Sequence, residues 1–237
     1  MYRKTIIAHR GASKYAKDNS IASFTKAIEL NADMVELDVR KTKDDVFVVC
    51  HDATLRGHLV SKLKYDEMQK IDQDIPTVAE VIALTKGKVG LVVELKIRRD
   101  ESSIVELLRK HLPDDDFMIV SFHAKSLARV KASYPGLRVG LLLAKYQPKN
   151  LIFTSRDESL PVKWANQLGA DFLLIHWRLL TPERLEIAKE NNKSVFVWVV
   201  NDPEMMKRVL GNDLIDGIIT DDPDTAVWLQ NELLKGN

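Results

Sequence analysis

Short apolar runs alternate with longer amphipathic segments along almost the whole chain. The apolar runs cover residues 5–9, 34–39, 46–50, 89–97, 117–122, 138–143, 171–176, 194–200 and 216–221. Most are unbroken by polar residues until their last positions, which predicts strands buried on both faces, as in a parallel sheet. Residues 34–39 and 46–50 count as one unit joined by the turn "KTKDD", so the chain contains eight strand units.

The segments between these strands carry apolar residues three and four positions apart, as amphipathic helices do. The segment 20–31 starts after Asn-Ser, and 76–87 opens with Pro-Thr and closes with Gly, which are helix-boundary signals. The other predicted helices cover residues 102–112, 124–134, 160–169, 181–192, 202–211 and 222–234. Eight strand–helix units predict an α/β fold, a TIM (β/α)8 barrel with a short insertion after the second strand unit. A doubly wound open sheet is the alternative, but no glycine fingerprint follows the first strand.

Composition agrees with one such barrel and narrows the choice of partners. The 237 residues, 45% of them hydrophobic, predict a single domain spanning residues 1–237. Lysine and arginine number 35 against 34 acidic residues, a balance that gives no indication of nucleic acid as a partner. The one cysteine, Cys50, excludes an internal disulfide and fits a reducing compartment.

Hydropathy predicts no stable membrane insertion. No apolar run approaches the roughly 20 residues that a membrane span needs, and the apolar run before His9 is too short for a signal peptide. We therefore expect a cytoplasmic protein. The sequence makes no prediction of the oligomeric state.

Polar side chains recur where the predicted strands end, which is the edge at which barrel enzymes carry their active sites. They are His9, Arg10, Glu36, Asp38, His51, Asp52, Glu94, Lys96, Ser121, His123, His176, Trp198, Asn201 and Asp221. Glu36 and Asp38 are two positions apart and share one face of their strand, with Cα atoms separated by roughly 6.5–7 Å. Val35, Leu37 and Val39 then face the helices.

Two carboxylates side by side inside a barrel repel each other unless a cation lies between them. Glu94 supplies a third carboxylate on the next barrel strand, and Lys96 follows it at the same two-residue spacing. Three oxygen donors with room for water suit a hard divalent cation, Mg²⁺ or Ca²⁺, better than Zn²⁺. The sequence therefore predicts a metal site at Glu36, Asp38 and Glu94.

Two histidines differ from the others because each ends an apolar strand beside the carboxylates. Imidazole titrates near neutrality, so His9 and His51 can act as general acid and general base across a substrate. Together with a metal ion, Arg10 and Lys96, they predict phosphoryl chemistry. The sequence has no Walker-type loop and no GxSxG elbow, which argues against nucleotide-driven transfer and serine hydrolysis.

At these residues the chain resembles the glycerophosphodiester phosphodiesterase family. The matching segments run in order along nearly the whole chain: "HRGAS", "NSIASFTKAIELNADMVELDVRKTKDDVFVVCHDATL", "IPTVAEVIAL", "VVELKI", "IVSFHAKSLARVK", "LLTPERLEIAKENNKSVFVWVVND" and "DGIITDDPD". The resemblance implies a TIM barrel that hydrolyses glycerophosphodiesters, which are small-molecule substrates, to an alcohol and sn-glycerol 3-phosphate with a divalent metal.

The resemblance also implies roles for single residues. His9 and His51 match the acid–base histidines; we favour His9 as the acid and His51 as the base. Glu36, Asp38 and Glu94 match the family's metal ligands. Arg10 and Lys96 match its phosphate contacts, and Trp198 matches an aromatic residue near the glycerol. Whether water or the substrate's own 2-hydroxyl attacks stays open at this point.

Two departures from the family's pattern bear on the substrate. Lys17-Asp18-Asn19-Ser20 stands where the family usually has Pro-Glu-Asn-Thr, and the segment after "HDATL" is short, keeping only Arg56-Gly57 of a longer run. A shorter insertion over the mouth favours bulkier substrates, so a lysophospholipase D or sphingomyelinase D-like reaction is an alternative. A barrel that only binds a phosphorylated ligand is a second alternative, of a different class.

Overall fold

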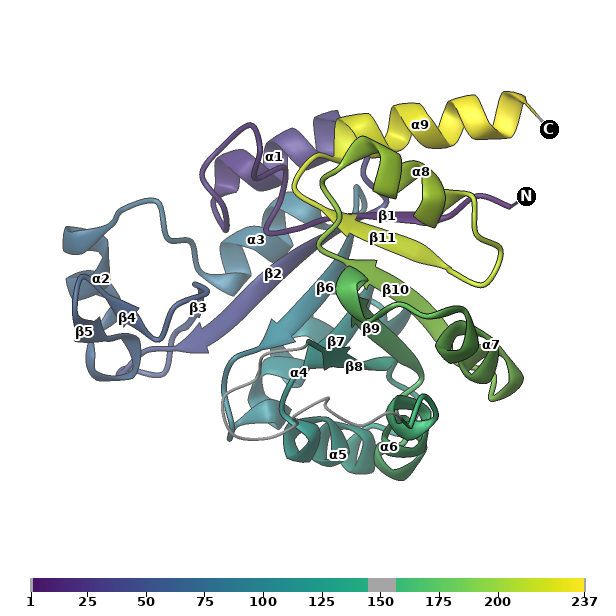
Figure 1. The fold of residues 1–237 in the computed structure, drawn as a ribbon. Coiled ribbons are helices and arrows are strands. Elements are labelled where there is room, and N and C mark those ends of the chain that lie inside the picture. The colour runs from purple at the N-terminus through teal and green to yellow at the C-terminus, as the bar shows by residue number, and fades with distance from the viewer. Residues whose placement is uncertain (1, 145–156, 237) are drawn as a thin grey trace.

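A closed barrel of eight parallel strands forms the centre of the protein (Figure 1). The computed structural model describes residues 2–144 and 157–236. Strand β1 pairs with both β2 and β11, which closes the barrel and confirms the predicted fold class over an open sheet. The barrel strands are β1 (Thr5–Ala8), β2 (Met34–Lys41), β6 (Gly90–Leu95), β7 (Phe117–Ser121), β8 (Val139–Leu143), β9 (Phe172–His176), β10 (Ser194–Trp198) and β11 (Gly217–Thr220).

Helices surround the barrel, one after each strand unit. Their starts follow the predicted signals, because Ser20 and Thr77 form capping boxes and three other helices begin with proline after a Thr or Asp cap. The outer helices are α1 (Ile21–Glu29), α3 (Val78–Thr85), α4 (Glu101–Arg109), α5 (Ala124–Ser133), α6 (Leu160–Leu168), α7 (Pro182–Glu190), α8 (Pro203–Leu210) and α9 (Pro223–Lys235). Within residues 2–144 and 157–236, none is long and apolar enough to cross a bilayer.

The insertion after β2 projects to one side of the barrel (Figure 1). It includes β3 (Phe47–Val49), the second half of the predicted strand unit, which pairs antiparallel with the end of β2. Elements that the sequence did not predict follow: β4 (Thr54–Leu55), β5 (His58–Leu59), the 3₁₀ turn η1 (Val60–Lys62) and α2 (Tyr65–Ile71). They pack on a small core of their own, made of Val48, Val60, Met68 and Ile75. Two other 3₁₀ turns, η2 (Asp114–Asp116) and η3 (Trp177–Leu179), lie beside barrel strands.

Two apolar cores result from the alternation of side chains along the strands. The larger lies between strands and helices and includes Val35, Leu37 and Val39 of β2, as predicted. The smaller fills the barrel and is made of residues such as Phe172 and Phe196. Glu36 and Asp38 alternate with the outward-facing residues, so they point into the barrel above the inner core.

Candidate active site

Three carboxylates lie together at the carboxyl ends of two neighbouring strands. Glu36 and Asp38 belong to β2 and Glu94 to β6, and the register pairs Asp38 directly with Glu94. One oxygen from each side chain lies within 4.8 Å of the others. All three side chains are buried, and the structure brings the three predicted metal ligands together.

Two cations reach into this cluster. Arg10 Nε lies 3.1 Å from Asp38 Oδ2. Lys96 Nζ lies 3.1 Å from Asp38 Oδ1 and 2.6 Å from Glu94 Oε1. Both predicted phosphate-binding residues are therefore ion-paired with the carboxylates, which holds their charged ends at the bottom of the site.

A tight turn after β1 carries Arg10 into position. Gly11 has a φ of 80°, and a Cβ there would lie 2.4 Å from Ser23 Oγ, so only glycine fits. The turn aims the Arg10 backbone N–H at Glu36 Oε2, to which it donates a hydrogen bond of 3.0 Å. The "HRG" motif thus has a backbone reason for its glycine.

The cluster contains three carboxylates and two cations, and burial and these charges shift the pKa of each carboxyl. Burial, reinforced by Asp38 and Glu94, raises the pKa of Glu36 well above its usual value. Burial likewise raises the pKa of Glu94 to about 7. Burial acts in the same direction on Asp38, but Lys96 and Arg10 outweigh it and lower the pKa of that carboxyl.

This arrangement fits a divalent cation. Asp38 Oδ1 and Glu94 Oε1 are buried, and no group of the described residues donates a hydrogen bond of good geometry to either, although Lys96 is within ion-pair distance. Buried carboxylate oxygens with acceptor capacity left, in a cluster with excess negative charge, are the ligand set that Mg²⁺ and Ca²⁺ prefer.

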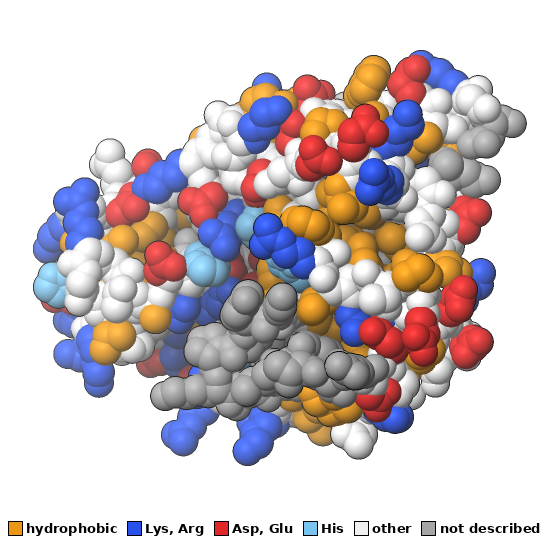
Figure 2. All heavy atoms as spheres, viewed as in Figure 1, with side chains coloured by type: hydrophobic (Ala, Val, Ile, Leu, Met, Phe, Trp, Pro, Cys, Tyr) orange, Lys and Arg blue, Asp and Glu red, His pale blue; other side chains and the backbone are white. Residues whose placement is uncertain are grey.

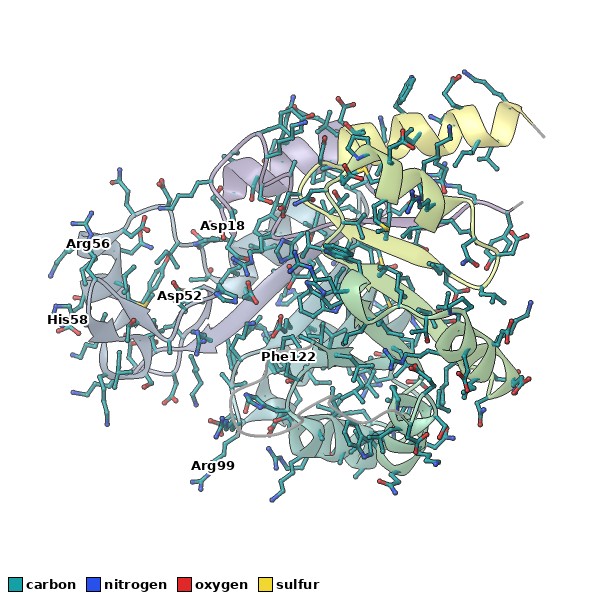
Figure 3. All side chains as sticks on the ribbon, viewed as in Figure 1. Asp18, Asp52, Arg56, His58, Arg99 and Phe122 are labelled. Atoms are coloured by element: carbon teal, nitrogen blue, oxygen red, sulfur yellow. The ribbon has the colours of Figure 1, made fainter. Side chains whose placement is uncertain are left out.

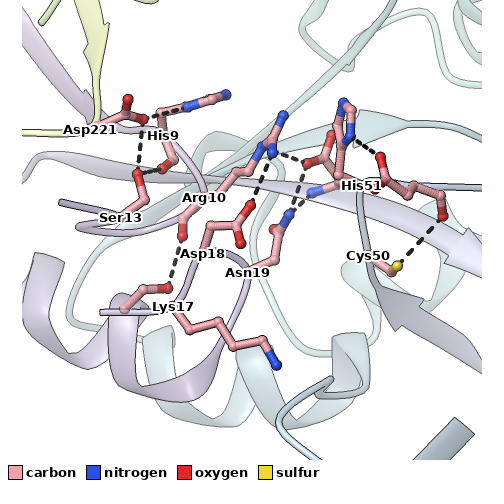
Figure 4. Close-up of polar contacts among 12 residues, drawn as sticks. His9, Arg10, Ser13, Lys17, Asp18, Asn19, Cys50, His51 and Asp221 are labelled. Carbon is pink, nitrogen blue, oxygen red and sulfur yellow. Dashed lines mark hydrogen bonds and ion pairs between the residues drawn. The ribbon is translucent and has the colours of Figure 1, made fainter. Parts of the chain in front are cut away.

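His9 follows β1 and is held by a carboxylate from the last barrel strand. Its Nδ1 lies 2.7 Å from Asp221 Oδ1, because β1 and β11 are paired neighbours. Ser13 Oγ donates to Asp221 at 2.8 Å (Figure 4). Asn201 Nδ2 also donates to it, at 2.5 Å. Burial would raise the pKa of Asp221, but the hydrogen bonds from His9 and its other donors outweigh it and lower that pKa to about 2. The carboxylate stays ionised and occupies Nδ1, which leaves Nε2 for a substrate.

His51 follows β3 and has the same kind of partner. Its Nδ1 lies 2.8 Å from Asp52 Oδ1 (Figure 4). Arg40 donates two hydrogen bonds to the His51 carbonyl oxygen, of 2.9 and 2.7 Å, which fixes the backbone. Burial, followed by the charge of Lys96, lowers the pKa of His51, so its imidazole is neutral at pH 7.

One cavity of about 150 Å³ brings these groups together. Its polar lining comprises His9, Arg10, Glu36, His51, Glu94 and Lys96, and its apolar wall comprises Val120, Phe122, Leu142, Leu174, Trp198 and Ile219. The indole N–H of Trp198 donates to the Leu174 carbonyl at 2.9 Å, and its ring packs edge-on against Phe122. Figure 2 shows histidine and basic side chains gathered around a hollow on this face.

Residues 17–20, which depart from the family's pattern, hold two residues of the site through hydrogen bonds. Asn19 donates from Nδ2 to Asp38 Oδ2 at 2.9 Å. Asp18 accepts from Arg10 Nη1 at 2.9 Å, so the shorter carboxylate still reaches its arginine. Lys17 pairs with two aspartates of the insertion, at 2.6 and 3.2 Å. The replacement of proline by Lys17 therefore ties this loop to the insertion.

Three supporting residues were not assigned a role from the sequence. Asp221 and Asp52 were noted only as polar residues at strand ends, and Asn19 only as part of a loop. A signal existed for Asp52, which is adjacent to His51 in the chain. For Asp221 the signal was the closure of the barrel, which makes the last strand the neighbour of the first.

The fold and the site together define a TIM-barrel enzyme whose functional groups lie at the carboxyl ends of its strands. The sequence profile of the Glycerophosphoryl diester phosphodiesterase family matches residues 9–225. The chain belongs to this family.

Individual relatives are also named as glycerophosphodiester phosphodiesterases. A glycerophosphodiester phosphodiesterase of Caldanaerobacter subterraneus subsp. tengcongensis is 33% identical over 94% of this chain and 96% of its own. A putative glycerophosphodiester phosphodiesterase of Bacillus subtilis is also 33% identical, with the same coverage. An Oleispira antarctica phosphodiesterase, solved in complex with the product sn-glycerol-3-phosphate, is 24% identical with a TM-score of 0.84 and 97% coverage of each chain. This structural likeness confirms the barrel fold.

Proposed function

We propose that this enzyme hydrolyses glycerophosphodiesters to an alcohol and sn-glycerol 3-phosphate with a divalent metal ion and two histidines. Family membership and the names of its relatives support the reaction. The product bound to the Oleispira antarctica phosphodiesterase supports it further. The strongest support from this chain is the single cavity that His9 and His51 share with the carboxylate cluster. Groups that can move protons and groups that can neutralise a phosphate therefore meet at one place.

Glu36, Asp38 and Glu94 would hold the metal ion, Mg²⁺ or Ca²⁺. Bound there, the ion would neutralise negative charge on the phosphate oxygens. Arg10 and Lys96 add fixed positive charge at the same end of the cavity. They orient the phosphate and stabilise the charge that develops on it.

Trp198 completes the substrate contacts that we propose. Its only polar hydrogen is already bonded to a carbonyl, so the ring offers the cavity an apolar surface. We assign this surface to the carbon atoms of the glycerol.

We assign His51 as the general base and His9 as the general acid. The lowered pKa of His51 keeps it neutral at pH 7, so it can take a proton from the nucleophile. The ionised Asp221 holds His9 at Nδ1, which leaves Nε2 to protonate the leaving alkoxide. The nucleophile, whether it is water or the substrate's 2-hydroxyl, gives its proton to His51 in this assignment.

A lysophospholipase D or sphingomyelinase D-like reaction is the second candidate, because the apolar wall of the cavity suits lipid-bearing substrates. A barrel that only binds a phosphorylated ligand is the third. Glycerophosphocholine and lysophosphatidylcholine, assayed side by side, separate them. We expect release of glycerol 3-phosphate from the first, its loss in EDTA and its return with Mg²⁺ or Ca²⁺. Full turnover after metal removal would contradict the role of the carboxylates.

The histidine roles are tested with two leaving groups. Protonation matters for choline but little for p-nitrophenol, so His9→Gln should lose about 100-fold or more on glycerophosphocholine and far less on the p-nitrophenyl ester of sn-glycerol 3-phosphate. His51→Gln should lose a similar factor on both substrates. His58→Gln, on the exposed strand β5, is the matched control and should keep full activity. Equal losses on both substrates in His9→Gln would overturn the assignment.

A further inference from the structure

A second groove, of about 510 Å³, lies between the insertion and the loop that joins β6 to α4. The described residues that line it come from the β2–β3 hairpin, from residues 53–62 of the insertion and from residues 96–100. Seven of them are lysine or arginine, and only Asp100 is acidic. The whole chain carries 35 basic and 34 acidic residues, so the groove is a local concentration of positive charge.

Most of this charge has no carboxylate to neutralise it. Lys41 pairs with Asp45 at 2.6 Å and with Asp100 at 2.9 Å, which accounts for the one acidic residue. Four other basic side chains have no carboxylate of residues 2–144 or 157–236 within ion-pair distance, and these are Lys43, Lys62, Arg98 and Arg99. All four are exposed, and Figure 3 shows Arg99 extending outward from its loop. Free cations on facing walls favour an anionic ligand.

The groove adjoins the candidate active site. Lys96 lines both the groove and the central cavity, and its Nζ lies 5.7 Å from the Phe122 ring centroid, on the wall that also carries Trp198. Arg40, which lines the groove, donates to the carbonyl of His51. A glycerol against Trp198 would therefore have Lys96 and the groove on one side, while His9, the proposed proton donor for the leaving alcohol, is held by Asp221, which follows β11.

We propose that the groove binds a second phosphate, carried on the free primary hydroxyl of the substrate's glycerol unit. This inference rests on the proposed function and identifies a substrate class, glycerophosphodiesters phosphorylated on the glycerol that the enzyme retains. Charge is the reason, because phosphate pairs well with lysine and arginine. A lysophospholipid carries an acyl chain at the corresponding end of its glycerol, which gains nothing from unpaired cations.

Two chromogenic substrates with the same leaving group test the proposal. They are the p-nitrophenyl ester of sn-glycerol 3-phosphate and the same ester with a phosphate on the 1-hydroxyl. For the wild-type enzyme at low salt, we expect kcat/KM to be about 10-fold higher for the phosphorylated ester, because exposed charges act most strongly when unscreened. We expect the advantage to shrink to about 2-fold or less near 1 M NaCl, where the Debye length is about 3 Å.

The variant Lys62→Gln with Arg99→Gln removes one free cation from each wall. It should lose the preference for the phosphorylated ester and keep its kcat/KM for the plain ester within about 2-fold. Lys207→Gln with Arg208→Gln, an exposed pair on α8, is the control and should keep the preference. No preference in the wild-type enzyme, or a preference that survives in the groove variant, would overturn the proposal. So would a variant that loses only inhibition by inorganic phosphate, since the groove would then bind a free anion.

A separate result bears on the underlying reaction. If neither ester is hydrolysed by the wild-type enzyme with metal present, the proposed function fails. If the plain ester is turned over and the preference is absent, only the groove assignment fails. The two failures are therefore distinguishable in one assay.

Discussion

Glutamine in place of Glu94 should stabilise the metal-free protein at alkaline pH. Burial raises the pKa of Glu94 to about 7, from an ordinary value of 4.5. Between these two values the folded protein binds a proton that the unfolded chain does not, so the stability of the metal-free protein falls as pH rises through this window. A shift of about 2.5 pKa units corresponds to roughly 3 kcal/mol, which is an upper limit for the cost of ionising this carboxyl without a metal.

Urea denaturation of EDTA-treated protein at pH 5 and pH 8 measures the effect. We expect the stability of the wild type relative to Glu94→Gln to fall by up to roughly 2.5 kcal/mol between the two pH values, because part of the full effect is already lost at pH 5. Groups whose pKa does not depend on Glu94, such as His51, cancel in this difference. Glu186→Gln, an exposed glutamate on α7, is the control and should show no such change.

The metal supplies the second half of the test. Mg²⁺ or Ca²⁺ should stabilise the wild type more at pH 8 than at pH 5, because protons compete with the metal for the carboxylates. Glu94→Gln should respond much less at either pH. The reasoning is wrong if the metal-free wild type becomes more stable relative to Glu94→Gln as pH rises, or if both proteins respond equally to metal.

Two further predictions concern His9 and the barrel interior. Asp221→Asn should lower kcat at least about 10-fold by removing the ionised partner of His9, with little change in KM. Because the pKa of Asp221 is lowered to about 2, this carboxylate should stabilise the wild type above pH 4, and the stabilisation should disappear as pH falls through about 2. Acid titration of the variant should show no such loss. Gly140→Ala should destabilise the protein by about 1–3 kcal/mol in thermal unfolding, because its Cβ would lie 2.1 Å from Phe172 Cε2. Gly136→Ala, with nothing within 4 Å, is its control, and equal shifts in both would contradict the overpacking argument.

The barrel was predictable because its strands and helices are encoded locally. Each strand is an apolar run, and five of the outer helices start at a residue whose side chain caps them, as at Ser20 and Thr77. The insertion was not predictable in the same detail. Strands β4 and β5 have two residues each, too short for a period to emerge, and α2 depends on a four-residue core that includes Val48 from another element. Tertiary contacts rather than local pattern define those elements.

In the candidate site, too, some residues could be predicted from local sequence and others could not. Its carboxylates and histidines could be found from sequence, since charge at the end of an apolar strand stands out without any knowledge of contacts. Their partners could not, because these are set by closure: His9 meets Asp221 across 212 positions. The basic groove was hidden for a similar reason. Its cations come from three separate segments, and the formal charge of +1 for the whole chain averages them away. Only folding concentrates them beside Lys96.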